Sequence, residues 1–308
     1  MSILCVGSVA LDSIETPFGH AERVLGGSAV FFSAAATFFA PVRMVGVVGD
    51  DYPLGELSFL AERGTDLSGI ETRPGESFFW AGRYQYDLGT RDTLETRLGV
   101  FADFRPRIPE GFRDSRYVFL GNIDPQLQHE VLDQVVKPDV VACDTMNYWI
   151  EGNRKELLSL LGRVDILLIN DAEARQLADE PNLLKASRWI RDRGPRIIVV
   201  KKGEHGAILF ADGWVFFVPG YPLETAFDPT GAGDAFAGGF MGYVAQAGSL
   251  AVEDLRRAMV FGSVMGSFAV EDFSIDRFKR LDPGEITERV RAFREMTAFE
   301  TQVEGFRV

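Results

Sequence analysis

The sequence is poor in histidine, cysteine and positive charge. It contains 3 His and 2 Cys in 308 residues, and 32 Lys and Arg against 45 Asp and Glu give a formal net charge of −13. Proteins that follow a phosphate backbone need a basic surface to release counterions, so the composition argues against a nucleic-acid partner. Cys5 and Cys143 each lie in a short apolar run, which predicts buried thiols and argues against a disulfide framework or a cysteine zinc site.

Long hydrophobic runs are also missing. No stretch reaches the roughly 18 apolar residues that a membrane-spanning helix needs. The first residues lead directly into a strand-like segment, without the basic and apolar regions of a signal peptide. We therefore expect a cytoplasmic protein with no membrane partner.

Two common nucleotide-binding motifs are absent. Residues 7–12 read Gly-Ser-Val-Ala-Leu-Asp, where a dinucleotide-binding chain would carry Gly-x-Gly-x-x-Gly after its first strand. This difference argues against a dehydrogenase. The P-loop pattern Gly-x-x-x-x-Gly-Lys-Ser/Thr occurs nowhere, so a Walker lysine is excluded as well.

Short β-branched apolar runs alternate with longer segments of helical period, which is the pattern of repeated β-α-β units. The fold class is therefore predicted to be α/β, with a mostly parallel central sheet and helices on both faces. The expected strands are 3–7, 42–48, 117–120, 140–143, 165–169 and 197–201, and the expected helices are 28–39, 53–63, 127–136, 153–161, 172–178, 183–193, 232–247 and 252–269.

Residues 77–101 break this alternation. Aromatic and β-branched residues flank a polar turn there, which predicts antiparallel strands. We expect this insertion, with part of 8–25, to form a small β-sheet lid within a single domain spanning 1–308. Its exposed face or edge predicts a homodimer through the lid. Its aromatic residues either pack on the sheet, meet a second subunit or stack on a ligand; they are Phe79, Trp80, Tyr84 and Tyr86.

A glycine-rich turn carries the clearest chemical signal. Residues 225–240 read Thr-Ala-Phe-Asp-Pro-Thr-Gly-Ala-Gly-Asp-Ala-Phe-Ala-Gly-Gly-Phe and lead into a helix. Gly231 and Gly233 let backbone N–H groups converge, and the helix that begins near Ala232 adds its positive end, so we expect an anion site. Asp234 lies in the first helical turn, where it either caps the helix or is directed at the bound anion.

Residues 228–234, Asp-Pro-Thr-Gly-Ala-Gly-Asp, resemble the C-terminal signature of the ribokinase-like (PfkB) carbohydrate kinases. Further similarities follow in the family's order along nearly the whole chain: Asp12 after the first strand, Gly-Gly-Ser-Ala at 26–29, Gly-Val-Val-Gly-Asp-Asp at 46–51 and Asn-Asp-Ala-Glu at 170–173. The resemblance implies a ribokinase-like fold and an ATP-dependent phosphotransferase that acts on a hydroxyl group and requires Mg²⁺.

The resemblance also implies a role for each matched residue. Asp234 would be the general base, and the N–H groups of Gly231, Ala232 and Gly233 would stabilise the transferred phosphoryl group. The substrate-binding residues would be Asp12, Gly26, Gly27, Ser28 and Asn147, and the nucleotide-binding residues Asn170, Glu173, Lys202, Gly203, Gly206 and Thr230. Glu173 would hold Mg²⁺ through water, and Asp228 with Thr230 would contribute to a K⁺ site.

Several of these residues also have structural interpretations. Asn170 can be a plain helix N-cap, Lys202 a solvated strand end, and residues 143–149, which offer Asp144 and Asn147, a packed turn. The apolar part of 261–266, where the family places a helix beside the adenine, is expected to be core.

Two parts of the sequence depart from the family. Val30 and Phe31 stand where many of its sugar kinases carry an Asn that contacts the sugar, which weakens the expectation of ribose- or fructose-like contacts. Pro229 replaces a Thr and stiffens the loop. We expect the acceptor to be a sugar, sugar acid or cyclitol. A nucleoside kinase is one alternative, since the aromatic insertion could stack a base. A non-catalytic metabolite-binding homologue is another, against which the intact Asp234 argues.

Overall fold

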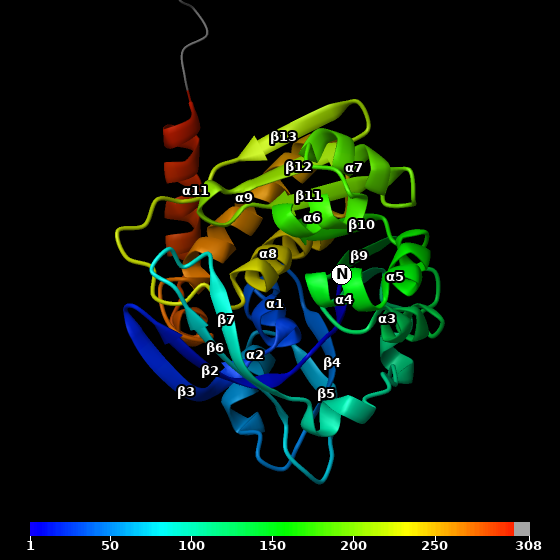
Figure 1. Cartoon of the computed structure of the whole chain (residues 1–308), viewed down its shortest axis with the longest axis vertical. Coiled ribbons are helices and arrows are strands. Elements are labelled where there is room, and N and C mark those ends of the chain that lie inside the picture. Colours follow the sequence, from blue (N-terminus) through cyan, green and yellow to red (C-terminus); the bar gives the residue numbers. More distant parts are fainter. Residues whose placement is uncertain (299–308) are drawn as a thin grey trace, which may run out of the picture.

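The computed structural model describes residues 1–298, and its main element is a nine-stranded sheet (Figure 1). The strands are β1 (Ile3–Val6), β4 (Val42–Val48), β5 (Asp66–Thr72), β8 (Tyr117–Leu120), β9 (Val140–Asp144), β10 (Ile166–Asn170), β11 (Ile197–Lys201), β12 (Ala207–Ala211) and β13 (Trp214–Val218). Their order across the sheet is β13-β12-β11-β10-β9-β8-β1-β4-β5. Strand β12 runs antiparallel to β11 and β13, and the other neighbouring pairs are parallel.

Both faces of this sheet are covered, which explains why its strands are apolar at consecutive positions. In β1, Ile3 and Cys5 belong to one core, and Leu4 and Val6 belong to the other. The first core includes residues of α1 (Ser28–Ala36), α8 (Ala232–Ala247) and α9 (Val252–Ala269), and the second includes residues of α3 (Pro125–Leu132), α5 (Arg154–Leu161), α6 (Asp171–Ala178) and α7 (Leu183–Arg191). Cys143 lies in the second core, so the prediction of two buried free thiols is confirmed.

A second, four-stranded sheet stands at the carboxyl edge of the large one (Figure 1). It consists of β2 (Ala10–Thr16), β3 (Gly19–Gly26), β6 (Phe78–Tyr84) and β7 (Arg91–Arg97), in the order β3-β2-β6-β7. Strand β2 follows β1 and β6 follows β5; because β1 and β5 run in the same direction, the chain leaves both at the same edge. The pairing of β6 with β7 confirms the antiparallel strands predicted within residues 77–101.

Asp51, the last residue of the 46–51 segment, binds the small sheet through hydrogen bonds. The N–H and hydroxyl of Ser77, just before β6, both donate to Asp51 Oδ1 at 2.7 Å. Arg23 of β3 donates to Asp51 Oδ2 at 2.8 Å. One carboxylate therefore ties two strands of the small sheet to the end of β4.

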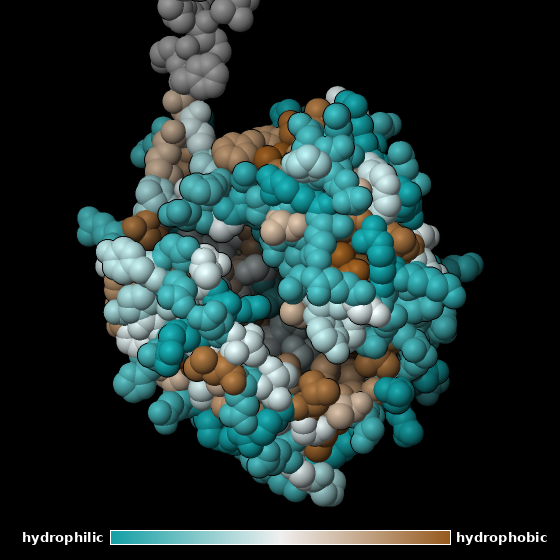
Figure 2. Space-filling view, in the orientation of Figure 1, coloured by the Kyte–Doolittle hydropathy of each residue, from teal (hydrophilic) through white to brown (hydrophobic). Residues whose placement is uncertain are grey.

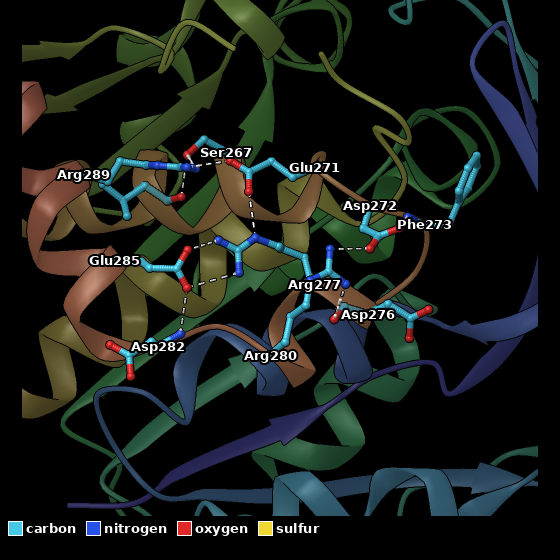
Figure 3. Close-up of polar contacts among 11 residues, drawn as sticks. Ser267, Glu271, Asp272, Phe273, Asp276, Arg277, Arg280, Asp282, Glu285 and Arg289 are labelled. Atoms are coloured by element: carbon cyan, nitrogen blue, oxygen red, sulfur yellow. Dashed lines mark hydrogen bonds and ion pairs between the residues drawn. The ribbon is translucent and has the colours of Figure 1, made fainter. Parts of the chain in front are cut away.

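A network of charged side chains holds the C-terminal helix α11 (Pro283–Thr297) against the end of α9 (Figure 3). Arg277, in the short helix α10 (Asp276–Lys279), pairs with Glu271 at 2.7 Å and with Glu285. Arg289 pairs with Glu271 and donates to Ser267 Oγ at 3.0 Å. The guanidinium carbons of both arginines lie over the ring of Phe268, 4.8 and 3.6 Å from its centroid. We call Glu271, Arg277, Glu285 and Arg289 the C-terminal cluster.

Some predicted boundaries were wrong. The helix expected at 53–63 is divided into a 3₁₀ turn, Leu54–Leu57, and the short α2 (Ser58–Glu62); Gly55 lies in the first part and weakens a continuous helix. Strands β5, β12 and β13 and helices α4 (Asn147–Gly152), α10 and α11 were not predicted. Strand β5 is interrupted by polar residues, so it lacks the continuous apolar run of a central strand. Strand β13 is apolar at every position, so its signal was present in the sequence and was missed. In the part of the chain that the structure describes, no helix is both long and apolar enough to cross a membrane.

Candidate active site

The candidate site lies where the strand order of the large sheet reverses. From β1 the chain proceeds to β4 and β5 on one side, and later to β8 and β9 on the other. Ligands of open parallel sheets bind beyond the carboxyl ends of the strands at such a reversal. Asp144, Asn170 and Lys201 are the last residues of β9, β10 and β11. Figure 2 shows a hollow in this face, between the small sheet and α6 and over the start of α8.

The predicted anion-binding turn forms the start of α8. Gly231 has a φ of +72°, and a Cβ atom there would lie 2.2–2.4 Å from ring atoms of Phe31, so only glycine suits this position. Phe31 is fully buried, and its ring packs against the turn at Gly231. The first N–H groups of a helix have no acceptor within the helix, so they are available to an anion. Among them, Ala232 N–H already donates a long bond of 3.3 Å to Pro229 O.

The turn is fixed from within by Asp228. Its side chain is fully buried, and its two carboxylate oxygens accept N–H bonds from Thr230 at 2.8 Å and from Ser274 at 3.3 Å. Burial raises the pKa of Asp228 to about 6, against the effect of these hydrogen bonds. The Thr230 hydroxyl donates to Tyr84 Oη of β6 at 3.1 Å, which joins the turn to the small sheet. Asp228 thus holds the loop, and its role as a K⁺ ligand stays a prediction.

Acidic side chains and one ammonium group meet beside the turn. Lys201 Nζ donates to Asp144 Oδ2 at 2.6 Å, and both side chains are largely buried. Burial and the charges of Asp144 and Glu173 raise the pKa of Asp234 to about 7, although Lys201 opposes them. Burial and the charge of Asp144 likewise raise the pKa of Glu173 to about 7. We call Asp144, Glu173, Lys201 and Asp234 the active-site cluster.

Asn170 and Glu173 form a capping box at the start of α6. Glu173 N–H donates to Asn170 Oδ1 at 2.8 Å, and Asn170 N–H donates to Glu173 Oε2 at 2.9 Å. The interpretation of Asn170 as an N-cap is therefore confirmed. Within residues 1–298, no three His, Cys, Asp or Glu side chains are placed to hold a metal ion by themselves. A hydrated Mg²⁺ needs few protein ligands. The Glu173 carboxylate fits that ion, because it supplies an oxygen donor in a cluster where carboxylates outnumber ammonium groups.

The part of the site that is predicted to bind the acceptor is built around Asp12. This residue is buried on β2, beside Trp80 of β6 in the same register, and a Cβ atom at Gly26 would lie 2.0 Å from its Oδ2. Gly26 therefore leaves room for the carboxyl group. Burial and the charges of Asp228 and Asp234 raise the pKa of Asp12 to about 8. Arg91, the first residue of β7, opposes that shift, and its guanidinium carbon lies 5.1 Å from the centre of the Trp80 ring.

Gly27 and Ser28 shape the backbone next to Asp12. Gly27 has a φ of +95°, and a Cβ atom there would lie 2.4 Å from Ser8 O. Ser28 exchanges hydrogen bonds with Ser8: each backbone N–H donates to the other hydroxyl, at 3.0 and 3.1 Å. The Ser28 side chain is thus used to join β1 to α1.

The remaining predicted residues lie in the segments that follow β9 and β11 and in α9. Asn147 is exposed at the first position of α4, whereas Asp144, three residues earlier, is buried in the cluster. Lys202 follows β11, and its N–H donates to Gly206 O at 2.8 Å; Gly206 is buried and Gly203 is exposed. In α9, Val264 and Met265 are in the core, as expected.

Sequence reasoning missed Lys201 and Arg91. Lys201 is the partner of Asn170 in the β10–β11 register. Because Asn170 was already assigned to the site, this pairing favours Lys201 over Lys202, but only the strand register of the structure reveals it. For Arg91 no comparable signal exists, since its position depends on how β7 pairs with β6.

The chain resembles several known proteins. A sequence model described as pfkB family carbohydrate kinase matches residues 120–277, just over half of the chain. The chain is 29% identical over 246 residues to the cytidine kinase of Thermococcus kodakarensis, covering 78% of this chain and 87% of that protein. It is 34% identical over 124 residues to fructokinase-2 of Zea mays, covering 38% of this chain and 36% of that protein. The structure of Burkholderia thailandensis nucleoside kinase in complex with inosine superimposes with a TM-score of 0.76 at 20% identity, over 96% of this chain and 98% of that one. This last likeness shows a shared fold.

Proposed function

The chain belongs to the pfkB family of carbohydrate kinases, and we propose that it transfers the γ-phosphoryl group of ATP to a hydroxyl group of a small sugar or sugar-like polyol. One observation carries the proposal. Asp234 lies in the first turn of α8, beside the anion-binding turn, and burial with the nearby carboxylates raises its pKa to about 7. A general base is most effective when its pKa lies near the working pH.

Asp234 accepts the proton of the acceptor hydroxyl as that oxygen attacks the γ-phosphorus. The N–H groups at the start of α8, from Gly231 to Gly233, stabilise the charge on the transferred group, because they are fixed in place before the reaction. Asp12 and the backbone at Gly26 and Gly27 orient the acceptor. Lys201, paired with Asp144, adds positive charge beside the turn.

On the nucleotide side, Asn170 and Glu173 lie at the end of β10, with Gly203 and Gly206 beyond β11. Glu173 is the residue that would hold Mg²⁺ through water. When bound, that ion neutralises phosphate charge. K⁺ at Asp228 and Thr230, contacts from Asn147 and Lys202, and a cytoplasmic location stay predictions.

We also propose that the small sheet is the lid of the site within the single domain predicted for 1–308, of which residues 299–308 lie outside the described part of the structure. Tyr84 of β6 contacts Thr230 of the anion-binding turn, and Asp12 of β2 lies within the electrostatic range of Asp234. Dimerisation through this sheet stays a prediction. Exposed apolar side chains at Phe18, Leu94 and Leu98 support it, because such groups favour association.

A nucleoside acceptor is the second candidate, and Trp80 is the observation that favours it. Its ring lies over Gly82, on the face of the small sheet that carries Asp12. A flat aromatic surface beside the Asp12 carboxyl group suits a nucleoside base. Stacking of a base on an aromatic ring contributes about 1–3 kcal/mol to binding. Trp80→Ala should then weaken nucleoside binding at least tenfold and leave a sugar's KM nearly unchanged.

The experiment is a measurement of ADP release with Mg-ATP across sugars, sugar acids, cyclitols and nucleosides, with Asp234→Asn in parallel. We expect turnover with one class of acceptor, abolished in the variant. Binding of ATP without turnover on any acceptor would contradict the proposal and favour a metabolite-binding protein.

A further inference from the structure

Lys201 occupies an unusual position for a lysine at a strand end. Its ammonium group extends from β11 past the end of β10 to Asp144 on β9, where Nζ lies 2.6 Å from Oδ2. Only 17% of its side chain and 6% of that of Asp144 are exposed. A lysine at the end of a strand can normally reach water, so burial of this one indicates a specific task.

The same ammonium group lies against the anion-binding turn. A Cβ atom built on Gly233 would be 3.1 Å from Lys201 Nζ and 3.6 Å from its Cδ and Cε atoms. Gly233 therefore leaves the space that the lysine side chain fills. The ammonium group thus lies next to the backbone N–H groups that begin α8.

The charge on Lys201 is secured by its neighbours. Burial lowers its pKa, but the carboxylates of Asp144, Asp234 and Glu173 raise it more, so its pKa lies above the ordinary value. The ammonium group is therefore positive at neutral pH. Three carboxylates around one ammonium leave negative charge in excess, which an additional cation on the incoming phosphates can offset.

We propose that Lys201 is a catalytic residue whose ammonium group contacts the γ-phosphoryl group of ATP during transfer, and that Asp144 is the positioning residue that holds it beside Gly233. This inference rests on the proposed kinase function. In the reaction, the acceptor oxygen forms a bond to the γ-phosphorus while the bond from that phosphorus to the β,γ-bridging oxygen breaks. ADP leaves with that electron pair, and the acceptor proton passes to Asp234. Lys201 gains and loses no proton; it stabilises the charge on the phosphoryl oxygens.

The test must separate phosphate contact from folding. Lys201→Met alone leaves the buried Asp144 carboxylate without its partner, which can unfold the protein. The double variant Lys201→Met/Asp144→Asn removes both charges and avoids that problem. The control is Lys279→Met/Asp276→Asn, which removes an exposed ion pair of 2.8 Å on α10.

The first readout is nucleotide binding to the full chain by calorimetry, with Mg²⁺ and either the non-hydrolysable ATP analogue AMP-PNP or ADP. Because only AMP-PNP carries a γ-phosphate, we expect the double variant to bind it about tenfold more weakly, as suits loss of a hydrogen bond to a charged group. ADP affinity should change far less. Equal changes for the two nucleotides would overturn the proposal.

The second readout is turnover. We expect the double variant to fold normally and release ADP on the order of 100-fold more slowly, while the control matches the wild type. If the ion pair between Lys201 and Asp144 served only folding, the double variant would release ADP at the wild-type rate. That result would overturn the proposal. A larger loss of turnover in Lys202→Met than in Lys201→Met would also overturn the proposal. The kinase function is judged separately, by ADP release from the wild type.

Discussion

The molecule contains two groups of interacting charges that differ in balance. In the C-terminal cluster, Arg277 and Arg289 face Glu271 and Glu285, so cations and carboxylates are equal in number. In the active-site cluster, Lys201 alone faces Asp144, Glu173 and Asp234. Both groups are at least partly buried, where charge interactions are strong.

The difference in balance indicates a difference in purpose. The balanced network lowers the pKa of Glu285, mainly through Arg277, and joins α11 to α9. In the unbalanced one, burial and the neighbouring carboxylates raise the pKa of Asp234 and Glu173 to about 7, which costs stability in the free protein. Strongly shifted pKa values in a cleft are typical of functional sites. We therefore assign stability to the first cluster and chemistry to the second.

The largest expected effect comes from Asp234→Asn. The change removes the general base and keeps the shape of the side chain, so kcat should fall by roughly 1000-fold or more. The free energy of unfolding should not decrease, because the change removes the repulsion between the Asp234 carboxylate and its neighbouring carboxylates. Steady-state ADP release and urea unfolding measure the two quantities. Turnover close to that of the wild type would remove Asp234 from the mechanism.

Arg277→Met should have the opposite pattern. Only 10% of the Arg277 side chain is exposed, and its loss leaves Glu285 without its ion-pair partner and Glu271 with Arg289 alone. We expect the free energy of unfolding to fall by about 3 kcal/mol, with kcat per folded molecule unchanged. Arg280→Met is the matched control, because its ion pair with Asp272 is more exposed and should contribute less than about 1 kcal/mol. Equal losses in the two variants would refute a structural role that is specific to the C-terminal cluster.

The pH dependence of activity follows from the sign of the Asp234 shift. Only the deprotonated carboxylate can accept a proton, and its pKa is raised to about 7. On the acid side of that value, kcat/KM should fall about tenfold for each pH unit. A profile of kcat/KM that stays flat from about pH 5.5 to pH 8 would show that a different group limits the reaction.

The last prediction concerns the dependence of stability on pH and Asp12. An aspartate whose folded pKa is raised to about 8 holds its proton more tightly when folded, so its contribution to stability is lost as pH rises from about 4 to about 8. Asp12→Asn should therefore stabilise the ligand-free protein at pH 8, and much less at pH 5. Thermal unfolding at both pH values measures this difference, and an equal shift at both would argue against it.

The central sheet could be predicted from the sequence because its strands are buried on both faces. Runs such as 42–48 and 197–201 are apolar at nearly every position and match β4 and β11. Strand β5 and helix α11 carry exposed polar positions, and their formation depends on contacts with residues distant in the sequence. Local composition therefore does not reveal them.

The candidate site was predictable where a residue type and the local backbone coincide, as at Gly231 and Asp234. It was not predictable where a side chain crosses the sheet. Lys201 reaches Asp144 over an intervening strand, a contact between residues 57 positions apart. Adjacent lysines in a sequence cannot show which of the two faces the site until the strand register is known.

The most direct test of this account compares ADP release per folded molecule in Asp234→Asn and Arg277→Met, measured side by side with the same acceptor. We predict almost no turnover in the first variant and nearly wild-type turnover in the second, at a temperature where both are folded. Comparable losses in the two variants, or greater loss in Arg277→Met, would contradict the division between a catalytic and a structural charge cluster.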